Sequence, residues 1–385
     1  FPWLWSVQRP QAVMAARVQV QGPGEHVACA APARPAAGVA SRTRLSPLFE
    51  STAGNNSVWV DAGAQLEEAI GGYAEVLQKL HDAGDTRDQL LLSQLLNAPT
   101  EVSLDYRHHH VRGVCYLLSI TEEHVAELQA SFVPRPTDVF VTTYPKCGTT
   151  WTQQICVLLK QGAEDEDRAF DPAVKVDIGA HAPWLDMVYP QKSLEDFEAM
   201  YDPRIFKTHA PFELMPTQRG LDGLPAAGKV VYVARNPKDA AVSHFHHARA
   251  ISGFKYDGPW GDFLQRFLAG QLEHGSWWAH HRRWWQAAQA APERVHWLEY
   301  EQLCVQASAT IAALAAFLGW QRPAAYIERV AQGSSIEVMR VQAGDQSKGR
   351  KAGEEPHIRK GGVGGWKQYF TVEQSEEFDR KWDAE

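Results

Sequence analysis

Short apolar runs alternate with segments of helical periodicity between residues 138 and 320. Four runs have the length and composition of buried strands: DVFVTTY (138–144), RIFKTH (204–209), KVVYVAR (229–235) and RVHWLEY (294–300). Helical segments follow three of the runs, at 151–160, 241–250 and 308–320. Strands that alternate with helices predict an α/β fold, in which a parallel central sheet is flanked by helices. In such sheets, ligands bind beyond the carboxyl ends of the strands.

The N-terminal part of the chain differs in composition from the rest. Residues 1–58 are rich in Ala, Pro, Gly and Arg and show little periodicity, which is typical of a disordered segment. Apolar residues recur at near-helical spacing between 66 and 96, which predicts short helices. We therefore expect an N-terminal extension, 1–105, and a folded domain, 106–385. A transit peptide and a partner-binding helix are alternative interpretations of the extension.

The charge balance limits the classes of partner. The formal net charge is −8, whereas proteins that bind nucleic acid or anionic membranes usually carry a basic surface. No apolar run reaches the about 18 residues that a membrane-spanning helix needs. We therefore expect no nucleic-acid partner and no membrane partner. A local basic pocket for an anionic cofactor is compatible with this balance.

Cysteine and histidine spacing predicts neither disulfides nor a metal site. The five cysteines are scattered and form no CxxC pair, which favours a reducing compartment, so we predict a cytoplasmic protein. The consecutive His108, His109 and His110 cannot converge on one metal from one face of a strand or helix. The other histidine groups lack a carboxylate or Cys partner at ligand spacing: His244, His246, His247, His280 and His281.

The segment TYPKCGTTW (143–151) has the features of an anion-binding loop. A strand, a tight glycine-bearing turn and a helix N-terminus bring backbone N–H groups together, and the helix dipole favours negative charge there. Lys146 adds a full positive charge, and Thr149 and Thr150 add hydroxyl donors. The Lys precedes the Gly, so this is not the GxxxxGK[ST] loop of nucleotide kinases.

Three separated segments resemble motifs of the cytosolic sulfotransferase family. The segment 143–151 resembles its phosphosulfate loop, and RNPKDAAVSHF (235–245) is similar to its 3′-phosphate strand–helix segment. IRKGGVGGWKQYF (358–370) resembles its C-terminal RKG loop. The similarity covers roughly residues 106–385 and implies the sulfotransferase fold with its P-loop-like phosphosulfate-binding loop. It also implies 3′-phosphoadenosine 5′-phosphosulfate (PAPS) as the donor co-substrate.

The resemblance places two cationic sites at the two anionic ends of PAPS. The loop around Lys146 would hold the 5′-phosphosulfate, while Arg235, Ser243 and the RKG loop would hold the 3′-phosphate, since Arg suits bidentate oxyanion contact. Trp151 would stack on the adenine, and Tyr300 would lie near its edge. The residues so assigned to the cofactor are Lys146, Cys147, Gly148, Thr149, Thr150, Trp151, Arg235, Ser243, Tyr300, Ser334, Ile336, Arg359, Lys360 and Gly361.

The segment KTHAP (207–211) matches the catalytic segment of that family. The match assigns His209 as the base that takes the proton of the acceptor hydroxyl. Lys207 and Lys146 would stabilise charge on the leaving group, and Ser243 would hold Lys146. The predicted reaction is sulfuryl transfer to a small, aromatic or apolar hydroxyl acceptor. An amine acceptor is an alternative.

Two positions depart from the family pattern. Cys147 replaces the usual Ser of the phosphate loop, and Gly365 stands where the RKGxxGDW motif has Asp. A thiol beside Lys146 and near a helix N-terminus has conditions that lower its pKa and favour oxidation. The hypothesis is that oxidants slow the enzyme, and a neutral Ser-to-Cys exchange is the alternative. We expect Gly365 to alter only the local rigidity of its loop.

The C-terminal segment carries a pattern that mediates dimer formation in that family. Its KxxxTVxxxE spacing is reproduced by Lys367, Thr371, Val372 and Glu376, which predicts a homodimer. Two other functions are alternatives to a sulfotransferase. One is a non-catalytic PAPS-binding or scaffolding protein, and the other is a P-loop small-molecule kinase, which would need a GK[ST] loop and Mg²⁺ ligands.

Overall fold

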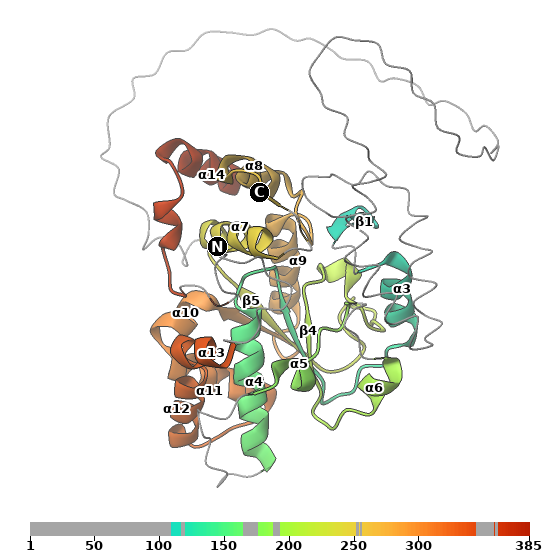
Figure 1. Cartoon of the computed structure of the whole chain (residues 1–385). Coiled ribbons are helices and arrows are strands. Elements are labelled where there is room, and N and C mark those ends of the chain that lie inside the picture. Colours follow the sequence, from blue (N-terminus) through green and yellow to red (C-terminus); the bar gives the residue numbers. More distant parts are fainter. Residues whose placement is uncertain are drawn as a thin grey trace, which may run out of the picture. The chain divides into compact units, whose positions relative to one another are not determined.

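Four parallel strands form the central sheet of the protein, a computed structural model (Figure 1). Their spatial order is β4 (Ile205–Thr208), β3 (Val139–Thr143), β5 (Lys229–Ala234) and β6 (Val295–Glu299). Each strand lies inside one of the four apolar runs, and all neighbours pair in parallel. The predicted parallel sheet is therefore confirmed. The chain passes from β3 to β4 on one side of it and then crosses to β5 on the other side, so the strand order changes direction at β3. In such sheets, ligands bind beyond the carboxyl ends of the strands at this position.

The structure describes residues 109–116, 120–164, 176–187, 193–251, 254, 256–343, 358 and 361–385. These residues belong to one structural unit, Glu75–Glu385. The predicted extension, 1–105, lies outside the described residues, and its boundary with the folded domain stays a prediction.

Each face of the sheet is apolar and is covered by helices, because neighbouring side chains of a strand point to opposite faces. Val139 and Val141 belong to the core on one face, and Phe140 belongs to the core on the other. The valine face packs against α4 (Thr149–Glu164), α11 (Ala307–Leu318) and α12 (Ala324–Gly333). The phenylalanine face packs against α3 (Glu122–Ser131), α6 (Leu194–Glu198) and α9 (Trp277–Ala290).

A third core lies beyond the carboxyl end of β3 and joins distant parts of the chain. It contains side chains of α7 (Pro237–Ala250), α8 (Trp260–Ala269) and α14 (Val372–Ala384), which Figure 1 shows as one group above the sheet. Tyr144 and Cys147, which follow β3, are buried in the same core. The loop after β3 is thus packed from one side by helices that come much later in the sequence.

Short elements complete the described part. An antiparallel hairpin, which the sequence did not predict, is formed by β1 (His109–Val111) and β2 (Val114–Tyr116). The remaining elements are α5 (Ile178–His181), the 3₁₀ helix η2 (Phe212–Leu214), α10 (Tyr300–Val305), α13 (Ile336–Ala343) and the 3₁₀ helix η4 (Gly365–Gln368).

A buried ion pair holds the amino ends of β3 and β4 together. The Arg204 side chain donates from Nε to Oδ1 of Asp138 at 2.8 Å and from Nη2 to Oδ2 at 2.6 Å, and both side chains are fully buried. Removing one partner of such a pair typically costs about 3–5 kcal/mol because the other charge is left uncompensated. The register that this pair supports places Thr142 opposite Thr208, and hence brings Thr143 next to His209.

Candidate active site

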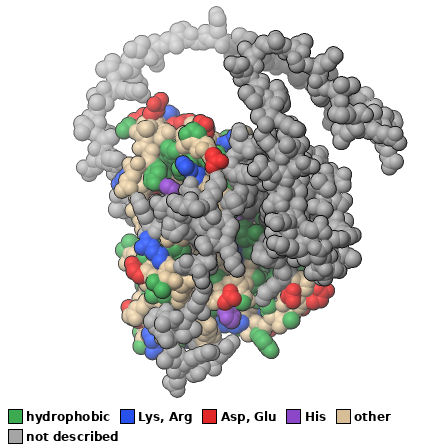
Figure 2. All heavy atoms as spheres, viewed as in Figure 1, with side chains coloured by type: hydrophobic (Ala, Val, Ile, Leu, Met, Phe, Trp, Pro, Cys, Tyr) green, Lys and Arg blue, Asp and Glu red, His purple; other side chains and the backbone are tan. Residues whose placement is uncertain are grey.

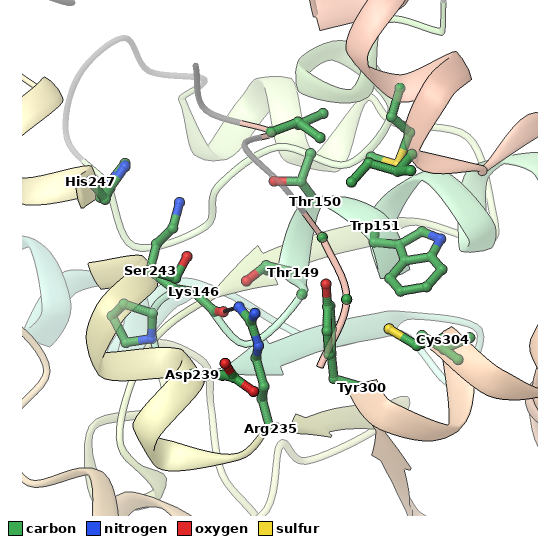
Figure 3. Close-up of a pocket in the computed structure, with 18 of the residues that line it drawn as sticks. Lys146, Thr149, Thr150, Trp151, Arg235, Asp239, Ser243, His247, Tyr300 and Cys304 are labelled. Atoms are coloured by element: carbon green, nitrogen blue, oxygen red, sulfur yellow. Dashed lines mark hydrogen bonds between the residues drawn. The ribbon is translucent and has the colours of Figure 1, made fainter. Parts of the chain in front are cut away.

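A pocket of about 780 Å³ opens at the carboxyl ends of β3, β4 and β5. Figure 3 shows part of its lining, with Asp239 and Ser243 on one side of Arg235 and Tyr300, Trp151 and Cys304 on the other. The predicted site residues that line it are Lys146, Gly148, Thr149, Thr150, Trp151, Lys207, His209, Arg235, Ser243, Tyr300, Ser334, Ile336 and Gly361. Arg359 and Lys360 lie outside the described residues, so their assignment stays a prediction. Cys147 does not line the pocket.

The loop after β3 turns tightly into α4. Lys146 and Gly148 have φ angles of +68° and +104°, in the left-handed region that favours glycine. A Cβ atom on Gly148 would lie 2.8 Å from Cδ2 of Tyr300, so the side chain of Tyr300 requires glycine here. Helix α4 begins at Thr149, and its first three residues all line the pocket. The positive end of the helix dipole is therefore directed at the pocket, where it favours an anion.

Arg235 follows the last residue of β5 and faces the same loop. Its Nη1 donates to the carbonyl oxygen of Lys146 at 2.8 Å, and its guanidinium lies 4.3 Å from the centre of the Tyr300 ring (Figure 3). The Nε–H is buried and has no hydrogen-bond partner in the part of the chain that the structure describes. A buried N–H of this kind costs free energy until an acceptor reaches it, so an oxyanion is a suitable ligand.

The C-terminal loop is tied to α7, the helix that follows Arg235. The carboxylate of Asp239 accepts the N–H of Gly364 at 2.7 Å and the N–H of Trp366 at 2.9 Å. Sequence reasoning missed Asp239, since only the folded chain brings these segments together. The contact places the end of the RKG loop beside the Arg235 end of α7, and Gly361 reaches the pocket.

Aromatic and apolar side chains form the part of the wall that begins at Tyr300, next to Arg235. The Trp151 and Tyr300 rings meet edge to face, with their centres 5.4 Å apart. The Ser334 hydroxyl donates to the Val330 carbonyl oxygen at 2.8 Å, and Ile336 packs against Gly361. The wall therefore offers flat apolar surface with few free polar groups, as an adenine ring requires.

His209 lies just after β4 with its ring held in one tautomer. Its Nδ1 lies 2.9 Å from the carbonyl oxygen and 3.0 Å from the hydroxyl oxygen of Thr143, and the hydroxyl group can accept as well as donate. Because a carbonyl oxygen only accepts hydrogen bonds, Nδ1 carries the proton and Nε2 keeps its lone pair. Burial lowers the pKa of His209 well below its usual value, and Lys207 and His274 lower it further. The imidazole is thus neutral at physiological pH and can act as a base through Nε2.

Lys207 lies two residues before His209, and its ammonium stacks on Trp184. Its Nζ is 3.9 Å from the centre of the Trp184 ring. The Trp184 ring is in turn nearly perpendicular to the His209 ring, and the two ring centres are 5.1 Å apart. Burial lowers the pKa of Lys207 to about 8, although the nearby Asp186 opposes this shift. Burial likewise raises the pKa of Asp186 to about 6. Trp184, which follows α5 in the chain, also lines the pocket.

The prediction of a lowered thiol pKa at Cys147 is wrong. The side chain is fully buried in the core formed by α7, α8 and Tyr144. Burial raises its pKa to about 12, and the opposing effect of the Arg235 charge is smaller. A neutral, inaccessible thiol is a poor nucleophile, so oxidation at Cys147 is not expected.

The cationic groups of the site lie inside a pocket. Figure 2 shows basic and acidic side chains of the described residues interspersed over the visible face.

Among the described residues, no cluster of three His, Cys, Asp or Glu side chains could hold a metal ion. None of the described helices is long and apolar enough to cross a membrane. The predictions of no metal and of no membrane or nucleic-acid partner stay predictions.

The parallel sheet, the glycine-bearing loop and the two cationic sites define an α/β protein built to bind a phosphorylated ligand. A family model described as "Sulfotransferase domain" matches residues 136–384. Mouse sulfotransferase 1B1 is 31% identical over 289 residues, which cover 71% of this chain and 90% of that protein. Rat sulfotransferase 1A1 is 32% identical over 277 residues, which cover 70% of this chain and 91% of that protein. The chain belongs to the sulfotransferase family, as the three motifs predicted.

Solved structures agree with this assignment. Mouse sulfotransferase SULT7A1, complexed with PAP, is 25% identical and superposes with a TM-score of 0.57 over 71% of this chain and 92% of that one. Retinol dehydratase, in a complex with retinol and PAP, is 24% identical and superposes with a TM-score of 0.60 over 78% of this chain and 94% of that one. The predicted sulfotransferase fold is confirmed.

Proposed function

We propose that this protein transfers a sulfuryl group from PAPS to a hydroxyl group of a small acceptor. The observation that carries the proposal is the tautomer of His209, whose free Nε2 shares one pocket with Lys146, Lys207 and Arg235. Sulfuryl transfer needs a base that takes the acceptor proton, cations that stabilise the leaving group and a cation that binds the anionic donor. The complexes of related sulfotransferase-fold proteins with PAP, the product that PAPS leaves, support the choice of donor.

In this proposal, the donor spans the pocket from the loop after β3 to α7. The N-terminus of α4 and Lys146 hold the 5′-phosphosulfate, because both provide positive charge there. Arg235 and Ser243 hold the 3′-phosphate together with the RKG loop, which Asp239 fastens in place. The adenine lies against Trp151 and Tyr300.

The reaction proceeds in line at sulfur. The acceptor O–H gives its proton to Nε2 of His209 as its oxygen forms a bond to sulfur. The bond between sulfur and the bridging phosphate oxygen breaks, and the electron pair stays on that oxygen. Lys146 and Lys207 stabilise the negative charge that develops there, in a pocket where water does not screen it fully.

The acceptor lies on the side of His209 away from the donor. We assign to the acceptor the apolar lining residues that the donor does not use, which are Trp184, Met187, Val242, Ile251 and Phe254. A pocket of this kind suits an aromatic or alicyclic hydroxyl compound. A non-catalytic PAPS-binding role would not require the held tautomer of His209.

A direct assay tests the proposed function. The purified full-length chain is incubated with PAPS and a panel of phenols, steroids, alcohols and amines, and the release of PAP is measured. We expect acceptor-dependent PAP release with at least one hydroxyl compound. Tight PAPS binding without release for any acceptor class would contradict the proposal.

We also propose that the protein is a cytoplasmic homodimer. Thr371 caps the N-terminus of α14 by accepting the N–H of Gln374 at 3.1 Å, and Val372 beside it is 77% exposed. An apolar residue exposed at a fixed helix start is available to a second copy. Lys367 and Glu376 lie on either side of it in the sequence, as the dimer pattern requires.

The pKa of Lys207 predicts how activity depends on pH. Burial lowers this pKa to about 8, so the ammonium is present below pH 8 and is lost as the pH rises through that value. We expect kcat/KM for PAPS, which reports groups of the free enzyme, to fall above about pH 8. In a Lys207→Arg variant the decline should move to higher pH, since Arg keeps its charge.

The variant Lys381→Arg provides the matched control for that pH profile, because Lys381 lies outside the pocket, where it pairs with Glu385 and its Nζ is 5.7 Å from the centre of the Trp278 ring. An alkaline decline at the same pH in wild type and in Lys207→Arg would show that another group is responsible.

A further inference from the structure

Three buried polar side chains meet beside the acceptor end of the pocket. His244 lies on α7, and Glu273 and His274 lie in the turn between α8 and α9. All three residues are at most 2% exposed. Nε2 of His244 is 2.6 Å from Oε1 of Glu273, and both Glu273 and His274 line the pocket. The spacing along the sequence did not indicate this pair, because Glu273 is 29 positions from His244.

Several polar atoms of this cluster lack a partner among the described residues. They are Oε2 of Glu273, Nδ1 of His244 and both ring nitrogens of His274. A buried polar atom without a hydrogen bond is unfavourable, because it has lost its bonds to water and gained none in the protein, so proteins rarely keep several such atoms together. The proposed transfer reaction uses none of these atoms. A ligand with hydrogen-bonding groups of its own would satisfy those of Glu273 and His274, the two residues of the cluster that line the pocket.

The backbone of His274 is held in an unfavourable conformation. Its φ angle is +65°, and among the described non-glycine residues only Arg112 and Lys146 also have a positive φ. Its N–H donates to the Cys115 carbonyl oxygen at 2.6 Å, and its ring meets the Tyr116 ring edge to face. The hairpin β1–β2 thus fixes His274 in place. Like Lys146, it is a strained residue in the wall of the pocket, and such strain is concentrated at ligand-binding positions.

The cluster lies next to the proposed base. The His274 and His209 rings have their centres 5.4 Å apart. Two imidazoles at this separation can each reach one of two hydroxyl groups on neighbouring carbon atoms. We propose that Glu273 and His274, with His244 behind Glu273, form a subsite for a second hydroxyl group adjacent to the one that is sulfated. The preferred acceptor is therefore a vicinal diol or a 1,2-dihydroxybenzene, and this inference rests on the proposed function.

The charge of the cluster favours a neutral group over an ammonium. Burial raises the pKa of Glu273 to about 8 and lowers the pKa of His244 to about 3. At neutral pH the carboxyl group then donates to Nε2 of His244, and Oε2 remains as an acceptor. The pair has no net charge, while the nearby Lys146 and Lys207 are cationic. An ammonium would meet positive charge without a carboxylate to offset it, whereas a hydroxyl group can both donate and accept.

The test compares four probes: phenol, 1,2-dihydroxybenzene, 2-methoxyphenol and 2-(aminomethyl)phenol. Their binding to the full-length chain saturated with PAP is measured by calorimetry, and their turnover is measured with PAPS. We expect 1,2-dihydroxybenzene to bind about tenfold more tightly than phenol, which corresponds to one well-placed hydrogen bond of about 1.4 kcal/mol. The 2-methoxyphenol, which has lost one O–H, should bind more weakly than 1,2-dihydroxybenzene.

Two variants separate the subsite from general packing. His274→Phe keeps a ring against Tyr116 and should reduce the 1,2-dihydroxybenzene-to-phenol affinity ratio to about one. Glu273→Gln keeps the size of the side chain and should reduce the ratio about threefold or more. Glu123→Gln, an exposed position on α3 outside the pocket, should leave the ratio unchanged. Thermal unfolding of each variant shows whether it is folded.

Three results would overturn the inference. Equal affinities of phenol and 1,2-dihydroxybenzene for the wild type would remove the subsite, and so would a ratio that both variants preserve. Tighter binding of 2-(aminomethyl)phenol than of 1,2-dihydroxybenzene would assign the subsite to a cation instead. A binding preference for the diol without PAP release from any probe would support the subsite and contradict the proposed transfer reaction.

Discussion

Replacing His209 with Ala should lower the rate of sulfuryl transfer by a factor of about 10² to 10⁴, the usual contribution of a positioned general base. The expected loss follows from the held tautomer. Nδ1 donates to the Thr143 carbonyl oxygen, so Nε2 is the atom that is free to take the acceptor proton. Alanine leaves no group at that position that could replace it. The affinity for PAP should change little, because Arg235 and the loop around Lys146 remain.

Single-turnover kinetics with PAPS and calorimetric titration with PAP separate the two effects. His181→Ala, at an exposed position on α5, is the matched control and should behave as the wild type. Sulfuryl transfer at an unreduced rate in His209→Ala would show that a different residue is the base. Equal losses of PAP affinity and rate would instead assign His209 to donor binding.

Replacing Arg235 with Ala should raise the Kd for PAP by about 10- to 100-fold, equivalent to about 1.4–2.8 kcal/mol. The side chain does two things that alanine cannot do. It presents a buried, unpartnered Nε–H to the pocket, and it holds the loop after β3 through the Lys146 carbonyl oxygen. Arg235→Lys keeps the charge but loses the planar fork, so its Kd should lie between those of the wild type and Arg235→Ala.

Calorimetry with PAP measures this effect, and adenosine serves as a ligand without phosphate groups. The affinity for adenosine should be nearly the same in all three proteins if Arg235 acts through a phosphate. Arg380→Ala, on the exposed side of α14, controls for the loss of one positive charge. An unchanged Kd for PAP in Arg235→Ala would place the 3′-phosphate elsewhere.

The elements that could be predicted from the sequence are those determined by local patterns. The four apolar runs form the four strands. Each run is bounded by turn residues and buries its apolar side chains by pairing in the sheet. The helices after β3 and β5 start earlier than their apolar pattern indicates, at Thr149 and Pro237. Their first turns carry the polar residues of the site, so the apolar periodicity begins only later.

The parts that could not be predicted depend on contacts between distant segments. Nothing local to His274 indicates that the hairpin β1–β2 holds it beside His209, and nothing local to Asp239 indicates its role for the C-terminal loop. For Cys147, the sequence indicated a property that the fold does not produce. Its neighbours in the sequence indicated a reactive thiol, but the side chain points into a core that α8 and α14 complete. Sequence position gives the neighbours of a residue, and only the fold gives its surroundings.

The two hydrogen bonds from the Asp239 carboxylate to the backbone at Gly364 and Trp366 have a consequence for synthesis of the protein. A nascent chain that has emerged as far as α11 already contains all four strands, the loop after β3 and His209. Its donor site nevertheless lacks a wall, because the segment that Asp239 fastens follows α13 in the sequence and is synthesised later. The polypeptide can therefore complete its sheet during translation before it acquires a closed donor pocket, which also requires the segment after α13.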